Sequence, residues 1–455
     1  MSLVREQANW NRLAEMIGAE NISSGSEWLA ERGWDGPLPA AVVYPGTAAQ
    51  VCEILRLAHA ERLVITPAGH GTKQRMGGVP QRVDLLLSLS KMNRITDYPA
   101  ADLTISVEAG LGVADLAAAL RAKRQMLPLD VPFAAEATVG GAVAANSSGP
   151  RRLAYGTFRD VVIGMRFVTA EGKLAKSGGK VVKNVAGYDM AKLLIGSFGS
   201  LGVITDVNFK VFPLPLCSRT FVLGFSDATK ALQARHRILN SPLLPQALDL
   251  VDSAVGTLTQ QAALAAAPYS LVMAAAGPEA VIQRFERDLA DLVRPDRPES
   301  IVAVSEEAEA ALWHAVQELT PTAVRQNPEA AVVKVSVVLS GMEHFLDTAR
   351  RAALDNGLEH AMLARAGTGI VYCYLWEKTE GASGPPAAVE RACRALLQEA
   401  DWVGGRAIIE WCCKKLKDKV AWWGSLQDDF PLMQRLKKQW DPEGILNPGR
   451  FYGGL

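Results

Sequence analysis

Three stretches of this chain are rich in glycine and other small residues, which allow a ligand to touch the main chain. They are PAGHGTKQRMGG (67–78), TVGGAVAANSSGPRRLAYG (138–156) and GGKVVKNVAGYDMAKLLIGSFGSLGVIT (178–205). Glycine is costly to order and occurs where φ is positive or where a ligand contacts the backbone. Neighbouring backbone N–H groups form concave sites for phosphate oxygens. Together the three stretches predict a site for a large cofactor that carries a diphosphate.

Each stretch also has a structural explanation. The first follows the apolar run LVIT (63–66), as a tight turn between two strands would, and it does not continue as a dinucleotide-binding G-x-G-x-x-G helix. In the second, Pro132 stiffens the approach, and Thr138 with Gly140–Gly141 offers a hydroxyl and two unshielded N–H groups. The small side chains of AVAAN (142–146) leave room for a flat ring, or they start a close-packed helix.

The third stretch combines glycines with polar groups. Gly196, Gly199 and Gly202 interrupt a connection between an expected helix near 189–195 and an expected strand near 202–212. Lys183, Tyr188 and Asp189 add charge and hydrogen-bonding groups. A glycine-rich helix-to-strand connection is the alternative, but the order and length of the three stretches favour a ligand site.

Composition narrows the class of protein. The 455 residues include 48 basic and 48 acidic side chains, so no overall field draws the chain to nucleic acid. A hydrophobic content of 49% with 21% charged residues describes a soluble globular protein. The six cysteines form no C-x-x-C motif and are expected to be buried thiols in a reducing cytoplasm. We find no signal-peptide pattern and no apolar run of about 20 residues, so a cytoplasmic protein without a transmembrane segment is expected.

Periodicity predicts an α+β protein with four segments. Residues 1–36 form an N-terminal helical segment, and 37–215 form a domain in which Thr47 caps a helix at 47–63 with Gln50 at its third position. The composition changes near Pro213 and Pro215. Residues 216–430 alternate strands and helices, as in a ferredoxin-like antiparallel sheet with helices on one face. Residues 431–455 form a last helix and a turn-rich tail.

Read in order, PAGHGTKQRMGG, TVGGAVAANSSGPRRLAYG, KNVAGYDMAKLLIGSFGSLGVIT and DPEGILNPGRF resemble the FAD-linked oxidase superfamily, whose FAD-binding domain is PCMH-type. GPRR followed by GGKVVKNVAGYD is most similar to the FAD-binding subunits of bacterial glycolate oxidases. The resemblance covers 41–213 and the last fifteen residues by motif, and the middle of the chain by architecture. It implies a two-subdomain FAD-binding fold, an α+β cap over the flavin, and a C-terminal tail that returns to the FAD domain.

The resemblance also implies where FAD lies. Its pyrophosphate is expected on the 67–72 turn and on 138–141, its adenosine on 199–204, and its isoalloxazine near 144–146, facing the cap. The residues expected to bind the cofactor are Pro67, Ala68, Gly69, His70, Gly71, Thr72, Gly77, Gly78, Pro132, Thr138, Val139, Gly140, Gly141, Ala144, Ala145, Asn146, Gly149, Gly199, Gly202, Val203 and Ile204. Some members attach FAD through a histidine, but Thr72 occupies that position here and His70 is one step away, so FAD is expected to be non-covalent.

The catalytic residues are harder to assign. Members that oxidise D-2-hydroxy acids have a metal-binding histidine pair, whereas the six histidines of this chain form no such pair, so no metal site is expected. The positions are His59, His70, His236, His314, His344 and His360. Oxidation of a hydroxyl needs a base, and none stands out near ARAGTGIVYCYL (364–375).

Lys334, His360 and Arg450 are the catalytic candidates that remain. Lys334, Arg365 or Arg325 could pair with a substrate carboxylate, or each could be structural. By the resemblance, Asn447 and Arg450 of NPGRF lie near the ring or the substrate mouth, unless this segment is a plain C-terminal turn.

Three functions fit these observations. The favoured one is an FAD-binding subunit of a complex that oxidises glycolate or D-lactate, with a sister FAD subunit, an iron–sulfur subunit and possible peripheral contact with a membrane through the complex. The second is a self-sufficient FAD-dependent dehydrogenase of a small 2-hydroxy acid. The third is a subunit whose FAD is structural. An NAD-dependent Rossmann enzyme does not fit, because no acidic residue follows a proper G-x-G-x-x-G at the required spacing.

Overall fold

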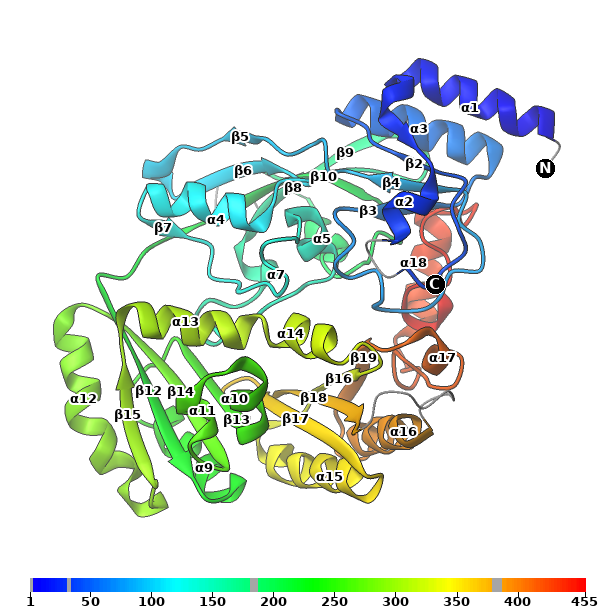
Figure 1. The fold of residues 1–455 in the computed structure, drawn as a ribbon. Helices are drawn as coiled ribbons and strands as arrows, with labels where there is room; N and C mark the ends of the chain where they lie inside the picture. Colours follow the sequence, from blue (N-terminus) through cyan, green and yellow to red (C-terminus); the bar gives the residue numbers. More distant parts are fainter. Residues whose placement is uncertain (1–2, 31–33, 181–186, 379–386) are drawn as a thin grey trace.

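The computed structural model describes residues 3–30, 34–180, 187–378 and 387–455. It shows two small sheets in the N-terminal region and one large sheet in the C-terminal region (Figure 1). The first small sheet has the order β1-β2-β4-β3, with β2, β3 and β4 parallel. Its strands are β1 (Ile22–Ser23), β2 (Ala41–Val43), β3 (Ile65–Ala68) and β4 (Leu85–Ser88).

The second small sheet is antiparallel, with the order β5-β6-β10-β8-β9. Its strands are β5 (Ile95–Asp97), β6 (Thr104–Glu108), β8 (Val162–Val168), β9 (Leu174–Gly178) and β10 (Val203–Lys210). A short pair, β7 (Gln125–Met126) with β11 (Phe212–Pro213), precedes the large sheet. The N-terminal helices are α1 (Leu3–Ile17), α2 (Gly25–Ala30), α3 (Ala48–Glu61), α4 (Val113–Ala122), α5 (Val139–Ala144), α6 (Arg152–Tyr155), α7 (Phe158–Val161) and α8 (Ala191–Leu194).

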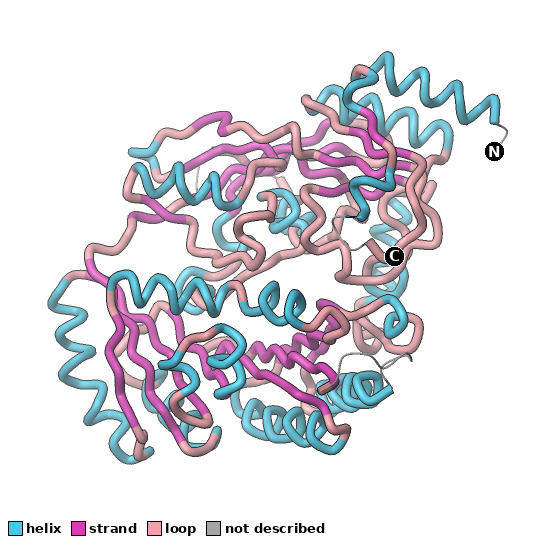
Figure 2. Tube along the Cα trace, viewed as in Figure 1, coloured by secondary structure: helices cyan, strands magenta, loops and turns pink. Residues whose placement is uncertain are grey.

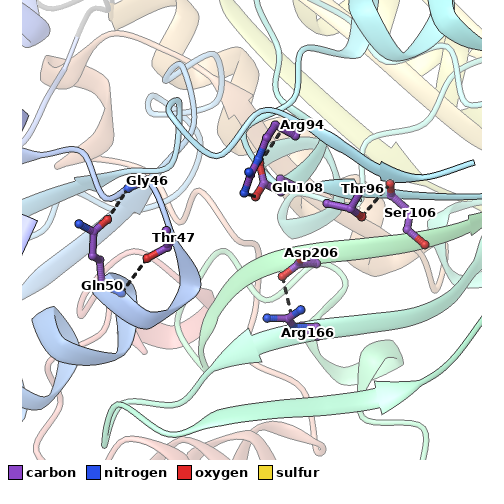
Figure 3. Close-up of polar contacts among 9 residues, drawn as sticks. All are labelled: Gly46, Thr47, Gln50, Arg94, Thr96, Ser106, Glu108, Arg166 and Asp206. Carbon is purple, nitrogen blue, oxygen red and sulfur yellow. Dashed lines mark hydrogen bonds and ion pairs between the residues drawn. The ribbon is translucent and has the colours of Figure 1, made fainter.

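Local sequence explains the start of α3. The Gln50 N–H donates to Thr47 Oγ1 at 3.3 Å, and the Gln50 side chain accepts from the Gly46 N–H at 2.8 Å (Figure 3). The first contact satisfies a donor that the first turn of the helix leaves open, and the second ties the residue before the cap to the same turn. The predicted Thr47 cap is therefore confirmed. Figure 3 also shows side-chain contacts on the second sheet, where Arg94 Nη2 donates to Glu108 at 2.7 Å.

The C-terminal tail packs into the N-terminal region. Ile445 and Leu446 belong to its hydrophobic core, and the Ile65 N–H donates to Ile445 O at 2.7 Å. On α18 (Phe430–Trp440), the buried Lys437 ammonium donates to Ser200 O at 2.8 Å and to Leu446 O at 2.7 Å. The predicted return of the tail is confirmed.

The large sheet is antiparallel and eight-stranded, with the order β15-β12-β14-β13-β17-β18-β16-β19. Its strands are β12 (Cys217–Phe225), β13 (Ala247–Asp252), β14 (Tyr269–Gly277), β15 (Ser300–Val304), β16 (Ala331–Ser336), β17 (Leu358–Arg365), β18 (Ile370–Glu377) and β19 (Arg406–Trp411). The helices of this region are α9 (Ala228–Leu239), α10 (Ser253–Thr259), α11 (Ala262–Ala265), α12 (Glu279–Val293), α13 (Glu306–Gln317), α14 (Leu319–Gln326), α15 (Met342–Asp355), α16 (Ala387–Trp402) and α17 (Lys414–Lys417).

Helices cover both faces of the large sheet, which corrects the expectation of helices on one face (Figure 2). On β18, Val371 and Cys373 pack with α9, α12, α15 and α16, whereas Tyr372 and Tyr374 face the side of α10, α13 and α14. Because side chains alternate along a strand, one strand serves two cores. Helices α13 and α14, which periodicity did not predict, lie between the large sheet and the N-terminal region (Figure 1).

No helix within the described ranges is long and apolar enough to span a bilayer.

Candidate active site

A first cavity of about 770 Å³ opens in the N-terminal region, where the three glycine-rich stretches meet the tail. The predicted residues that line it are Pro67, Ala68, Gly69, His70, Gly71, Thr72, Thr138, Gly140, Gly141, Ala144, Ala145, Gly199, Gly202, Val203 and Ile204. Its wall also contains Lys73, Gln74, Leu89, Ala109, Phe198, Asn447 and Arg450. The structure therefore brings together segments that lie far apart in the sequence, as the glycine pattern predicted.

The turn after β3 presents open main-chain donors. The N–H groups of Gly71, Thr72 and Lys73 donate to no other described residue. Gly71 has φ of 85°, a conformation that favours glycine. A Cβ at Gly69 would lie 1.9 Å from Thr138 Oγ1, so the turn rests directly on the start of α5. Free N–H groups beside a cavity suit the oxygens of a diphosphate.

The start of α5 differs from the prediction. The Gly140 N–H donates to Ala109 O at 2.7 Å, and the Gly141 N–H faces Thr138 Oγ1 at 3.3 Å, so neither group is unshielded. A Cβ at Gly140 would lie 2.6 Å from the Cβ of Ala109. Glycine is needed at this position for close packing against the end of β6. The close-packed helix start, the alternative left open by the sequence, describes this segment.

Six predicted cofactor residues lie outside the lining of this cavity. Gly77 and Gly78 pack on the tail, and the Gly78 N–H donates to Arg450 O at 3.0 Å. Gly149 lies against Asp130, with its N–H donating to Leu129 O at 2.7 Å. The other three are Val139, which is buried, Asn146, whose buried Oδ1 meets no donor among the described residues, and Pro132, which lines a second cavity.

In the third stretch, Lys183 lies outside the described residues. Tyr188 is 92% exposed, and Asp189 forms an exposed ion pair with Lys192. Tyr188 and Asp189 do not line the first cavity.

The second cavity lies between the N-terminal region and the large sheet, with about 380 Å³ of space that includes its opening to solvent. Lys73 lines both cavities, so they adjoin. The remaining lining residues are Asp130, Pro132, Ser147, Ser148, Val316, Gln317, Thr320, Lys334, Arg365, Tyr372, Tyr374 and Glu410. Several of these side chains are charged, although the cavity lies in the interior of the protein.

The loop of residues 131–134, which includes the lining residue Pro132, is held by the junction of α13 and α14. Glu318 accepts from the N–H groups of Phe133 at 3.2 Å and Ala134 at 2.9 Å, and Gln317 Nε2 donates to Val131 O at 2.8 Å. Phe133 has a φ of 60°, which costs backbone energy in a bulky residue. These contacts hold the loop in place and so position Pro132 over the cavity.

A buried charge network forms the floor of the second cavity. Lys334 Nζ lies 3.0 Å from Glu410 Oε1, and Lys73 Nζ lies 3.5 Å from Glu410 Oε2. Burial alone would raise the pKa of Glu410, but the charges of Lys334 and Lys73 lower it to about 2. Burial alone would lower the pKa of Lys334, but the charge of Glu410 raises it above its usual value. Both groups are therefore ionised at neutral pH.

Arginine side chains add positive charge around this network. Arg365 pairs with the buried Asp249, and Arg151 Nε donates to Asp130 at 2.7 Å. Arg152 Nη1 donates to Ser148 Oγ at 3.1 Å, and no carboxylate of the described residues forms an ion pair with it. Burial lowers the pKa of Arg152. The cavity therefore contains more positive than negative charge.

The catalytic candidates lie in three different places. Lys334 lies in the second cavity, and Arg450 lines the first, where its Nη2 donates to Met76 O at 2.7 Å and burial lowers its pKa to about 10. His360 lines a separate groove with Glu343 and Asp347, outside both cavities. It lies five residues before Arg365 on β17, and alternation along the strand turns the two side chains to opposite faces. His360 is therefore not in a position to act in either cavity.

The remaining predicted polar residues lie near the rims. Arg325 pairs with Glu136 and is exposed, and His70 Nδ1 contacts Glu136 O at 2.8 Å. Asn447 Nδ2 donates to Phe198 O at 2.5 Å, which joins the tail to the cavity wall. In the described ranges, no group of three or more His, Cys, Asp or Glu side chains is arranged to hold a metal ion.

The periodic patterns missed Lys73, Tyr372 and Glu410. Lys73 follows the glycine turn directly, and Glu410 is the single charge inside the apolar run of β19, so both gave a weak signal. Tyr372 lies in an apolar strand, and no feature of the sequence marked it as a site residue.

Two family models match the chain. The FAD binding domain matches residues 39–178, and the C-terminal domain of FAD linked oxidases matches residues 214–451. The glycolate oxidase subunit GlcD of Bacillus subtilis (strain 168) is 26% identical over 451 residues, covering 97% of this chain and 96% of that protein. The glycolate oxidase subunit GlcE of Escherichia coli (strain K12) is 45% identical over 125 residues, covering 27% of this chain and 36% of that protein.

A solved structure supports the same fold. p-Cresol methylhydroxylase with substrate bound superposes with a TM-score of 0.79 at 17% identity, covering 99% of this chain and 97% of that chain. At this identity the match shows the fold alone, a PCMH-type FAD-binding architecture with an α+β second region. The open amides of 71–73 and the small residues of α5 that line the cavity fit a diphosphate-bearing flavin. From the two family models and this cavity, we conclude that the chain belongs to the FAD linked oxidases and that its cofactor is FAD.

Proposed function

We propose that the protein is the FAD-binding subunit of a complex that oxidises a small 2-hydroxy acid, glycolate or D-lactate, to the 2-oxo acid and passes the electrons onward. The observation that carries this proposal is the second cavity, which is small, contains more positive than negative charge, and shares the lining residue Lys73 with the first cavity. A carboxylate substrate in the second cavity would lie next to a flavin in the first. The full-length similarity to GlcD and the local similarity to GlcE support the substrate class.

FAD, held without a covalent bond, supplies the acceptor for two electrons and a hydrogen from the substrate carbon. The chain supplies binding and orientation. The amides of 71–73 would hold the diphosphate, and Asn447 and Arg450 bound the same cavity from the tail. Lys334 and Lys73 would hold the substrate carboxylate, because both line the second cavity and, among the described residues, both pair with the same carboxylate, Glu410.

The roof of the second cavity would exclude water during the reaction. Gln317 and Glu318 hold the 131–134 loop over the cavity, and Phe133 stacks on Trp411 with ring centroids 6.2 Å apart. In a closed site of low dielectric, the attraction between the lysines and a carboxylate is stronger than in water. The loop and the α13–α14 junction therefore raise the affinity for a small anion.

The names of the relatives support a multi-subunit assembly. GlcD and GlcE are both named as subunits of glycolate oxidase, and this chain resembles each of them. In the proposed assembly, a sister FAD subunit shares the oxidation and an iron–sulfur subunit carries electrons away. The assembly would be cytoplasmic, with contact to a membrane through the complex.

A self-sufficient dehydrogenase is the second candidate, because one chain contains both cavities. The FAD-loaded chain, alone and with its co-purified partners, is mixed without oxygen with glycolate or with D-lactate, and the visible flavin absorbance is followed. Loss of absorbance only with partners supports the complex, and loss in the isolated chain supports the second candidate. If neither sample is reduced, although dithionite reduces both, the FAD is structural and the proposal is wrong.

A further inference from the structure

Tyr372 presents a hydroxyl to the second cavity. It lies on β18, on the face of the large sheet that is turned toward the N-terminal region. Its hydroxyl makes no hydrogen bond to any residue that the structure describes, although the side chain is only 7% exposed. Two residues along, the hydroxyl of Tyr374 lies 2.9 Å from Thr320 Oγ1. Because Tyr372 lines the cavity, its hydroxyl is available for a hydrogen bond to a ligand there.

Positive charge surrounds Tyr372. The Lys334 ammonium lies 5.5 Å from its ring centroid, and the Arg365 guanidinium lies 5.8 Å from it. Arg152 donates to Ser148 Oγ at 3.1 Å, and Ser148 lines the same cavity. One negative charge shared between the Tyr372 oxygen and a substrate oxygen would be stabilised by these cations, whichever oxygen holds the proton.

Oxidation of a 2-hydroxy acid removes two hydrogens with different fates. The hydrogen on the α-carbon leaves with its electron pair to FAD, the C–O bond becomes double, and the hydroxyl hydrogen leaves as a proton. That proton needs an acceptor within hydrogen-bond reach of the substrate oxygen. This requirement rests on the proposed function.

Other groups in the second cavity are poor acceptors. Lys334 already holds its proton, since the charge of Glu410 raises its pKa, and Arg365 pairs with Asp249. Glu410 has a pKa of about 2, which makes it a weak base, and both of its oxygens face lysines.

We propose that Tyr372 is the catalytic base, whose side-chain oxygen accepts the proton of the substrate's α-hydroxyl group. As the Tyr372 oxygen takes this proton, the hydroxyl gives its own proton to solvent, so the residue is a phenol before and after the step. Lys334 and Lys73 hold the carboxylate of the same substrate, so the hydroxyl and the carboxylate have different partners.

The test compares Tyr372→Phe with Tyr155→Phe in the FAD-loaded protein, together with any partner subunits that activity requires. Tyr155 is a matched control, because its hydroxyl accepts from Gln246 Nε2 at 2.9 Å and lies outside both cavities. Three quantities are measured: the FAD content, the rate constant of flavin reduction by the substrate, and the affinity for oxalate from the change in flavin absorbance. Oxalate has carboxylates but no hydroxyl proton.

For Tyr372→Phe we expect unchanged FAD content, unchanged oxalate affinity and a rate constant lower by about 10²- to 10⁴-fold, the usual contribution of a general base. Tyr155→Phe is expected to keep all three quantities. A rate constant within a few-fold of the unmodified protein overturns the proposal, as does an equal loss of oxalate affinity, which indicates a structural role. If no 2-hydroxy acid reduces the unmodified complex, the proposed function itself is wrong.

Discussion

The two cavities are lined by different kinds of chemical groups. The wall of the first is mostly main chain and small side chains, and it includes residues 71–73, whose amides donate to no other described residue. The second is lined by charged and aromatic side chains from strands β16–β19 and from the N-terminal region. A main-chain wall is sensitive to any added atom, whereas a charged wall is sensitive to the loss of a partner. The two sites should therefore respond differently to substitution.

The difference in lining also indicates different roles for the two cavities. Main-chain amides offer fixed donors at fixed positions, which suits a cofactor that stays bound. Ion pairs such as Lys334–Glu410 can share their charge with an incoming anion, which suits a substrate that enters and leaves. Of the residues that the structure describes, only Lys73 lines both cavities.

Glu410→Gln should have the largest effect, on stability. The substitution leaves Lys334 and Lys73 buried near each other without their shared carboxylate, and breaking a buried ion pair costs about 3–5 kcal/mol. Urea unfolding followed by circular dichroism measures the change. The control is Glu286→Gln, which breaks a surface pair with Arg219 and should cost about 0–1 kcal/mol. Equal costs for the two variants would show that the buried network is not the stabilising element.

A second prediction uses pH on the same network. The folded pKa of Glu410 is about 2, against an ordinary value of 4.5. A depressed carboxylate pKa contributes stability that is present above the ordinary pKa and is lost as the pH falls from 4.5 toward 2. The contribution is roughly 3 kcal/mol, at about 1.4 kcal/mol per unit. Urea unfolding of the unmodified protein and of Glu410→Gln should therefore converge as the pH falls, and parallel curves would contradict the assignment.

The contrast between a main-chain lining and a side-chain lining also explains which cavity could be predicted from the sequence. The first cavity was predictable because a main-chain site needs glycines, which appear as local motifs such as PAGHG. The helix at α3 was predictable because its cap, Thr47 with Gln50, is also local. Gly140 instead allows close packing against Ala109. The glycine motif alone does not distinguish this packing role from ligand binding.

The second cavity was not predictable as a unit. Lys73, Lys334, Tyr372 and Glu410 come from distant parts of the chain, and only the pairing of β16 with β18 and β19 brings the last three together. A single lysine in the apolar strand AVVKVS marked Lys334 as unusual, but its partner was not visible. The bounds of β17 were also undetermined, so His360 remained a candidate until the structure showed one unbroken strand over Leu358–Arg365, in which alternation places His360 and Arg365 on opposite faces.

Lys334→Met should weaken substrate binding and leave FAD binding unchanged. It removes one ammonium group from the second cavity while keeping a side chain of similar length, and a hydrogen bond to a charged group contributes about 1.5–3 kcal/mol. That loss corresponds to a KM higher by about 10- to 150-fold. FAD content, measured from visible absorbance against protein concentration, should not change. Loss of FAD along with the rise in KM would show that the two cavities are not separate in function.

The smallest effect that we predict is on FAD itself, from Gly69→Ala. The new methyl group would lie 1.9 Å from Thr138 Oγ1, so the turn would have to move away from α5, carrying the amides of 71–73 with it. Overpacking of this kind costs about 1–3 kcal/mol, which corresponds to FAD binding weaker by about 5- to 150-fold.

Titration of the apoprotein with FAD measures this loss. Gly46→Ala is the matched control, because a Cβ there would be 3.7 Å from its nearest neighbour, Gln50 Oε1, and would fit without movement. The KM of substrate for the fraction that still contains FAD should stay near that of the unmodified protein, because the lysines of the second cavity are untouched. If Gly69→Ala and Gly46→Ala bind FAD equally well, the turn is not the part of the wall that holds the cofactor.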